Sequence, residues 1–267
     1  MNQDQVKELL LSLEDDVPEF SVVFTGKESK RVDGLYKPDS KEILIHNRNF
    51  ATDNAMLYTA IHEFAHHVHF SRYPDEVTRR AHTNRFWDLF HGLLSRAEDE
   101  GVYENIFEKD PAFRAITERI RKDYLEKNGS LMKEFGRTLI EAMDLCREKH
   151  AVFEDFAERI LGMTRGSART LMKVYALDVD TDLGYENMKV VATIRNPGER
   201  KEASESFREG KTPPQVRQEI KDARPEPEMT LGRLEAQKRR LEKNISNLTE
   251  KLENIERQLQ ELASEAN

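Results

Sequence analysis

The chain has one cysteine, Cys146, among its 267 residues. A single cysteine excludes an intrachain disulfide, so nothing requires an oxidising compartment and we expect a cytoplasmic location. The chain also lacks any run close to the roughly 20 apolar residues that cross a bilayer. Its first residues lack the basic start and apolar stretch of a signal peptide. The sequence therefore predicts a protein without a membrane span.

Positive charge is also scarce, because 42 Lys and Arg residues stand against 50 Asp and Glu residues and the net charge is −8. This balance disfavours a protein that coats nucleic acid without sequence preference, although a local basic patch can exist in an acidic chain. Charged residues make up 34% of the chain and hydrophobic residues 37%, a composition that suits helices with long solvated faces. We therefore predict an α+β fold that is predominantly helical.

Composition and periodicity divide the chain into four segments. Residues 1–125 combine short strand-like runs with helices and predict a small domain with a short β-sheet. Residues 126–222 have helical periodicity between glycine and proline turns and predict an all-α middle domain. Residues 223–230 are rich in proline and glutamate and predict a linker. Residues 231–267 predict a C-terminal coiled coil.

The first segment contains the only strong strand patterns. Residues 21–24 predict a short strand. Residues 34–36 and 43–45 form apolar and β-branched arms on either side of a Pro-Asp turn, which predicts a hairpin. The apolar spacing in residues 53–70 predicts a buried helix. A second helix is expected from about Arg79 to Leu94.

The last segment repeats apolar residues at alternating steps of three and four, with Lys238 in one core position. This heptad pattern predicts a homodimer, or pairing with a partner helix, through residues 231–262. A helix that folds back on its own protein is the alternative. The apolar positions are Leu231, Leu234, Leu241, Ile245, Leu248, Leu252, Ile255, Leu259 and Leu262.

The predicted helix of residues 53–70 carries the sequence His62-Glu63-Phe64-Ala65-His66. Histidines four residues apart project from one face of a helix and can share a metal at about 2.0–2.1 Å. Glu63 lies about 100° around the helix from His62, where its carboxylate can take a proton from water and return it to a leaving amine. Two buried histidines that only pack in the core are the alternative.

A catalytic zinc needs a third protein ligand, and His82 is our candidate. The motif His-Glu-Phe-Ala-His-His, with the downstream His-x-x-x-Phe-Trp that ends at Trp87, resembles the SprT-like zinc peptidases and their relatives, including the ImmA/IrrE group. The resemblance covers about residues 18–100. It implies that His62, His66 and His82 bind Zn²⁺, that Glu63 is the general base, and that Phe86 and Trp87 are packing residues.

The interval between His66 and His82 is longer than in the most compact SprT-like members. Glu98 and Glu76 therefore remain alternatives for the third ligand. We assign ordinary packing or solvated roles to the remaining histidines of this region, which include His67 and His69. A tyrosine could donate a hydrogen bond to an oxyanion, and the sequence does not choose among Tyr58, Tyr73 and Tyr103.

The middle segment offers a helix-turn-helix pattern over about residues 150–176, with Gly162 at the turn. Residues 129–222 resemble helical DNA-binding modules of phage and plasmid proteins, some of the partition-protein type, which implies DNA as a partner. A plain helical bundle is the alternative. DNA binding also requires the acids of the first helix to face away from phosphate. These acids are Glu154, Asp155 and Glu158, and the second helix presents Arg165, Ser167, Arg169, Thr170 and Lys173.

These patterns lead to one main hypothesis and two rivals. The main hypothesis is a zinc-dependent protease that cleaves a protein substrate, is brought to DNA or to a DNA-bound target by its middle domain, and is paired by its coiled coil. The first rival is a non-enzymatic DNA-binding or adaptor protein with a structural or vestigial metal site. The second is an ImmA-like regulatory protease whose substrate is a repressor.

Overall fold

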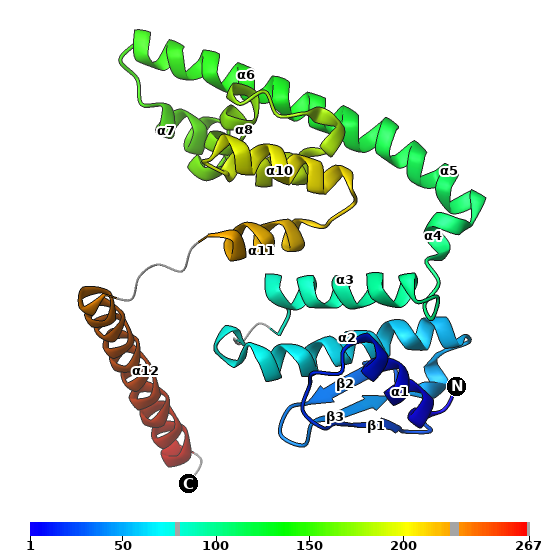
Figure 1. Ribbon diagram of the computed structural model, residues 1–267. Coiled ribbons are helices and arrows are strands. Elements are labelled where there is room, and N and C mark those ends of the chain that lie inside the picture. Colours follow the sequence, from blue (N-terminus) through cyan, green and yellow to red (C-terminus); the bar gives the residue numbers. More distant parts are fainter. Residues whose placement is uncertain (78–80, 225–229, 266–267) are drawn as a thin grey trace. The chain divides into compact units, whose positions relative to one another are not determined.

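The computed structural model describes residues 1–77, 81–224 and 230–265 (Figure 1). It divides into two compact units, Met1–Ala223 and Arg224–Asn267. The chain is mostly helical with one small three-stranded sheet, which confirms the predicted α+β, predominantly helical class. Most of the predicted linker, residues 223–230, and the predicted helix start near Arg79 lie outside the described residues. None of the described helices is long and apolar enough to cross a membrane.

The sheet contains β1 (Ser21–Phe24), β2 (Gly34–Lys37) and β3 (Glu42–Ile45), in the order β1-β3-β2. β2 pairs antiparallel with β3, which confirms the predicted hairpin, and β1 pairs parallel with β3. β2 is therefore an edge strand, with one side paired to β3 and the other side turned toward a helix. Helix α1 (Gln3–Leu13), closed by a capping box at Asn2, packs against β1.

Helix α2 (Asp53–Arg72) crosses the core of this part of the chain and begins at the N-cap Thr52. Ile61, Phe64 and Ala65 are fully buried, so α2 is a core helix, as its apolar spacing predicts. The one-turn helix η2 (Pro74–Glu76) follows, and α3 (Asn84–Asp99) then packs along α2. Helix α3 begins at Asn84 because Thr83 caps it, so residues 81–83, which were predicted to be helical, precede the helix.

The rest of unit 1 is helical, and the structure describes no strand between residues 106 and 223. The run α5–η3–α6 passes without interruption through the predicted domain boundary at residue 125. The elements are α4 (Ile106–Lys109), α5 (Pro111–Ile120), the π-helix η3 (Arg121–Glu126), α6 (Lys127–Glu148), α7 (Phe153–Asp155), the π-helix η4 (Phe156–Ile160), α8 (Arg165–Ala176), η5 (Thr181–Leu183), α9 (Tyr185–Thr193), α10 (Pro197–Arg208) and α11 (Pro213–Ala223).

Unit 1 has separate apolar cores in the part that contains the sheet and in the helical part that follows it. One cluster joins α1, the sheet, α2 and α3, and two smaller clusters lie among α6 to α11. Helices α6 and α8 approach closely at Gly136, where an added Cβ would lie 2.2 Å from the carbonyl oxygen of Leu171. Only glycine permits this contact, because any side chain would collide with the backbone of α8.

Unit 2 is one long helix, α12 (Leu231–Glu265). Every large apolar side chain that the structure describes on this helix is exposed, from 48% at Leu234 to 74% at Leu231. The predicted heptad is therefore present as an uncovered apolar stripe. The side chain of Leu262, the last predicted core position, lies outside the described side chains.

Candidate metal centre

Three histidine side chains from two elements of unit 1 converge on one point. His62 and His66 lie on consecutive turns of α2, and His82 precedes the N-cap of α3. The Nε2 atom of His82 lies 3.1 Å from Nε2 of His62 and 3.1 Å from Nε2 of His66. In the described part of the chain, these three residues form the one cluster whose ligand atoms could hold a metal ion.

The spacing of these nitrogens fits a tetrahedral ion. With metal–nitrogen bonds of about 2.0–2.1 Å, two nitrogens of a tetrahedral site lie about 3.3 Å apart. Hydrogen bonding alone is a poorer account, because Nε2 of a neutral imidazole carries either one proton or one lone pair, so Nε2 of His82 can make a hydrogen bond with only one of the two other histidines. The residues present therefore fit a divalent cation with three nitrogen ligands.

The three imidazoles are neutral near pH 7, as metal ligands must be. Burial, with a smaller contribution from His82, lowers the pKa of His62 to about 4. Burial and the neighbouring histidines lower the pKa of His66 to about 3. Burial also lowers the pKa of His82. Protons therefore compete weakly with a metal for these nitrogens.

Aromatic rings from α3 pack against all three histidines. The ring of Phe86 is fully buried and stacks on His66 with centroids 4.2 Å apart. Phe90 meets the ring of His62 edge-on at 5.0 Å. Trp87 lies against His82 at 5.4 Å. These contacts restrict the rotation of the imidazoles, so that little ordering is left for a metal to impose.

Glu63 lies beside the three histidines in a buried position, with 8% of its surface exposed. Its Oε2 atom accepts a 2.8 Å hydrogen bond from the main-chain N–H of Tyr36 in β2. Burial raises the pKa of Glu63 to about 7, and the hydrogen bond opposes this rise only in part. A carboxyl group with this pKa can exchange protons readily at neutral pH.

A hydrogen-bonded chain next to Glu63 was not predicted from the sequence. The hydroxyl of Tyr36 lies 3.0 Å from Nδ1 of His67, and Nε2 of His67 lies 2.9 Å from the carbonyl oxygen of Pro18. A carbonyl can only accept, so Nε2 carries the proton and Nδ1 accepts from Tyr36. His67, fully buried, therefore ties α2 to β2 as well as packing. His69 is also fully buried, and its ring nitrogens have no hydrogen-bond partner among the described residues.

The alternative third ligands lie in other surroundings. Glu76 accepts hydrogen bonds from Lys221 and Arg85. Glu98 accepts a 3.4 Å hydrogen bond from Asn105. Neither carboxylate belongs to the cluster that could hold a metal, so the described residues bring His82, and not these acids, to His62 and His66.

A cleft of about 370 Å³ opens onto the three histidines and Glu63. Its other walls are mostly apolar and come from β2, α2 and the segment before His82. Of the three tyrosines considered from the sequence, only Tyr58 lines this cleft. The remaining lining residues are Val32, Asp33, Gly34, Leu35, Thr59 and Ala81.

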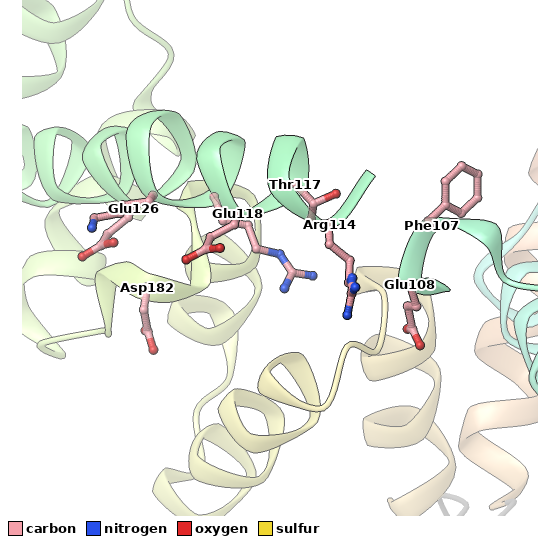
Figure 2. Close-up of a pocket in the computed structure, with 9 residues that line it drawn as sticks. Phe107, Glu108, Arg114, Thr117, Glu118, Glu126 and Asp182 are labelled. Carbon is pink, nitrogen blue, oxygen red and sulfur yellow. The ribbon is translucent and has the colours of Figure 1, made fainter. Parts of the chain in front are cut away.

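A larger cavity, of about 560 Å³, lies away from this centre along α4, α5 and η3. Figure 2 shows the side chains of Glu108, Arg114 and Glu118 pointing into it, while the ring of Phe107 points away from them. Its lining mixes carboxylates with cations and contains no histidine. Of these two, only the smaller cleft brings possible metal ligands together with a buried acid, so the smaller cleft is the candidate functional site. The cavity is lined by Phe107, Glu108, Arg114, Thr117, Glu118, Arg121, Lys122, Glu126 and Asp182.

The comparison with protein-family models finds no match, and the searches of curated proteins and of solved structures find none either. The likeness to SprT-like and ImmA/IrrE peptidases therefore remains one of motif. The arrangement of His62, Glu63, His66 and His82 rests on this chain's own geometry.

The predicted helix-turn-helix region forms α7, η4 and α8, with the turn at Gly162. Both arginines at the start of α8 pair with acids of the preceding helix. Arg165 binds Glu158 through two hydrogen bonds of 2.8 and 3.0 Å, and Arg169 lies 3.1 Å from Glu154. Glu154 and Glu158 thus lie against the arginines that would have to bind phosphate. DNA binding requires these acids to face away from phosphate, and this requirement is not met at these two arginines.

Proposed function

We propose that this chain is a zinc-dependent peptidase whose centre is formed by His62, His66 and His82. The observation that carries the proposal is the convergence of the three Nε2 atoms, at 3.1 Å from His82 to each of the others, beside a buried carboxyl group. The described residues offer three ligands and an open cleft. A purely structural zinc site is usually closed by four protein ligands.

The chain's own residues supply the remaining parts of a hydrolytic mechanism. Zn²⁺, when bound, lowers the pKa of water and polarises a carbonyl group. Glu63 takes a proton from the attacking water and returns it to the leaving amine, a task that suits its pKa of about 7. The rings of Phe86 and Phe90 keep the imidazoles oriented and exclude water from the protein side of the centre.

The cleft also suits an extended peptide as substrate. The edge of β2 that is not paired with β3 borders the cleft through Gly34 and Leu35 and donates the N–H of Tyr36 to Glu63. The remaining main-chain groups of such an edge can bind a peptide through hydrogen bonds. An added Cβ at Gly34 would lie 2.9 Å from Cγ of Glu63, so the glycine lets this edge lie close to the proposed base. The main chain of the bound peptide would thus lie next to Glu63 and the proposed metal centre.

Two measurements test this proposal. Purified protein should hold one zinc ion per chain, and replacement of His62, His66 or His82 by Ala should greatly reduce zinc binding. Incubation with a mixed peptide library, read by mass spectrometry, should show cleavage. Glu63→Gln should keep zinc and lower the cleavage rate by at least about 10²-fold.

Glu98→Gln serves as the matched control, because it makes the same chemical change at an acid outside the histidine cluster. It should keep both zinc and cleavage. A wild-type chain that binds no zinc, or a Glu63→Gln variant that cleaves at the wild-type rate, would contradict the proposal.

We further propose that α12 pairs two copies of the chain. The support is its apolar stripe, which is exposed along the whole described length of the helix and follows a heptad. Leu252→Lys, in the middle of the stripe, should shift sedimentation equilibrium toward a monomer. Asn247→Lys, with the same introduced charge on another face, should not. An unchanged mass in Leu252→Lys would refute pairing through this stripe.

A further inference from the structure

A helix at the C-terminal end of unit 1 contacts residues that precede and follow His82 in the sequence. This helix, α11, packs along α3, whose first turn follows His82 (Figure 1). The contact joins parts of the chain that lie more than 100 residues apart, and both belong to unit 1. Thr212, just before α11, also bonds His91 of α3 through its hydroxyl, 3.0 Å from Nδ1.

The contact is centred on Arg85, of which 9% is exposed. Its Nη1 and Nη2 atoms donate to the two carboxylate oxygens of Asp222 at 2.7 and 2.8 Å. Gln218 donates a further 2.9 Å bond to Asp222, so the carboxylate is held from two sides. A planar, two-bond contact between arginine and a carboxylate fixes orientation as well as distance.

The same helix reaches the other end of the segment through Glu76. Lys221 donates to Glu76 at 3.0 Å, and Nε of Arg85 donates to the same carboxylate at 3.4 Å. The guanidinium of Arg85 also lies over the ring of Tyr73, 4.3 Å from its centre. Two neighbouring residues of α11 therefore bind positions six residues before and three residues after His82.

The ring of His82 packs against Phe86 and Trp87 of α3, with centroids 4.6 and 5.4 Å apart, so the placement of His82 depends on the placement of α3. His82 is exposed, and among the described residues the only hydrogen-bonding atoms within reach of its ring are Nε2 of His62 and Nε2 of His66. Those contacts are the ones that a metal replaces. The position of His82 before metal binding therefore depends on α3, whose N-cap residue follows it directly.

We propose that Asp222 and Lys221 are positioning residues for the metal centre, which hold His82 in place through Arg85 and Glu76. This inference rests on the proposed metal site. Groups that orient a ligand from outside the first coordination sphere change metal affinity by about 10–100-fold when they are removed. A displacement of α11 would therefore be transmitted to His82, the third ligand.

The test uses the full chain and zinc alone, with a chromophoric chelator as competitor. Asp222→Asn keeps the shape of the side chain and removes its charge, so we expect zinc affinity to fall about tenfold or more. Asp222→Glu should restore much of the loss. The matched control is Asp180→Asn, which breaks the ion pair between Asp180 and Arg208 elsewhere in the helical part. It should leave zinc affinity unchanged.

Cobalt supplies a readout that general loss of stability does not move. The visible absorption of Co²⁺ reports the number and geometry of its ligands, so Asp222→Asn should alter this spectrum in protein that circular dichroism shows to be folded. Lys221→Met, at an exposed position, provides a second variant that is expected to fold and to weaken zinc binding.

The outcomes separate the two proposals. Wild-type affinity and an unaltered cobalt spectrum in both Asp222→Asn and Lys221→Met would overturn the positioning role and leave the metal site standing. A wild-type chain that binds neither zinc nor cobalt would overturn the metal site, and the positioning role with it.

Discussion

The main-chain N–H of Tyr36 donates a 2.8 Å hydrogen bond to Oε2 of Glu63. The two residues are 27 positions apart and belong to a strand and a helix. The bond fixes the carboxylate against the edge of the sheet, while the side chain of Tyr36 binds His67 on the next turn of α2. One tyrosine therefore joins β2 to the proposed base through its backbone and to α2 through its hydroxyl.

Removal of that hydroxyl should cost stability more than activity. Tyr36→Phe leaves the buried Nδ1 of His67 without its donor, and an unsatisfied buried polar atom costs about 1–3 kcal/mol. The main-chain bond to Glu63 remains. Urea denaturation should show the loss, and peptide cleavage should change less than threefold. Tyr124→Phe, at a 66% exposed tyrosine, should leave the free energy of unfolding unchanged.

Gly34→Ala tests how closely β2 must approach the base. The new methyl group would lie 2.7 Å from Cγ2 of Thr59 and 2.9 Å from Cγ of Glu63, so the strand or the carboxylate has to move. We expect cleavage to fall at least tenfold while zinc binding is kept. Gly92→Ala in α3 meets nothing within 4 Å and should stabilise the protein by about 0.5–1 kcal/mol. Full activity in Gly34→Ala would show that the approach is not needed.

Gly136→Ala addresses the packing of the helical part. Its methyl group would lie 2.2 Å from the carbonyl oxygen of Leu171, so α6 and α8 would have to separate. We expect a loss of about 1–3 kcal/mol or more in the free energy of unfolding, which is typical of overpacked sites. Gly166→Ala on α8, where the nearest atom is 3.9 Å away, is the control. Equal stability of the two variants would contradict the close approach.

Acid should destabilise the metal-free protein. The pKa values of His62 and His66 fall from 6.5 to about 4 and about 3 on folding, so the unfolded chain binds protons that the folded chain refuses. Stability is therefore lost as the pH falls from about 6.5 toward these values. Glu63 acts in the opposite sense, because its pKa rises from 4.5 to about 7 and its contribution is lost as the pH rises through that range.

Denaturation midpoints in the presence of a chelator, measured between pH 4.5 and 7.5, would show this balance. The midpoint should decrease toward acid in the wild type. In Glu63→Gln it should decrease more steeply, because the opposing carboxyl group is gone. A midpoint that does not change with pH would contradict the burial of these histidines in the metal-free state.

The hairpin, the core helix α2 and the pair His62 and His66 could be predicted because each depends on short-range patterns. Apolar arms on either side of a turn indicate β2 and β3, and helical spacing brings His62 and His66 to one face. His82 was suggested by the motif resemblance, which left Glu76 and Glu98 open, and only the folded chain brings it to the other two histidines. The contact of Tyr36 with His67 and that of Arg85 with Asp222 could not be predicted, since they span 31 and 137 positions. The parallel pairing of β1 with β3 likewise depends on the path of the chain between them.

The electrostatic properties of Glu63 and of the α8 arginines could not be predicted from the sequence either. The raised pKa of Glu63 depends on its burial in the folded chain, which the sequence does not show. The composition of α8 likewise resembles that of a DNA-binding helix. The pairing of its arginines with Glu154 and Glu158 depends on how the two helices are oriented, which the sequence does not show.

The uncovered stripe of α12 has a consequence for how the protein melts. A helix owes most of its stability in water to the packing of an apolar face, and on α12 the described side chains of this face are exposed. Whatever covers it stabilises it by mass action. Dilution should therefore lower the temperature at which α12 unravels and leave the unfolding of residues 1–223 unmoved, so that heating would give two steps, only the first of which depends on protein concentration.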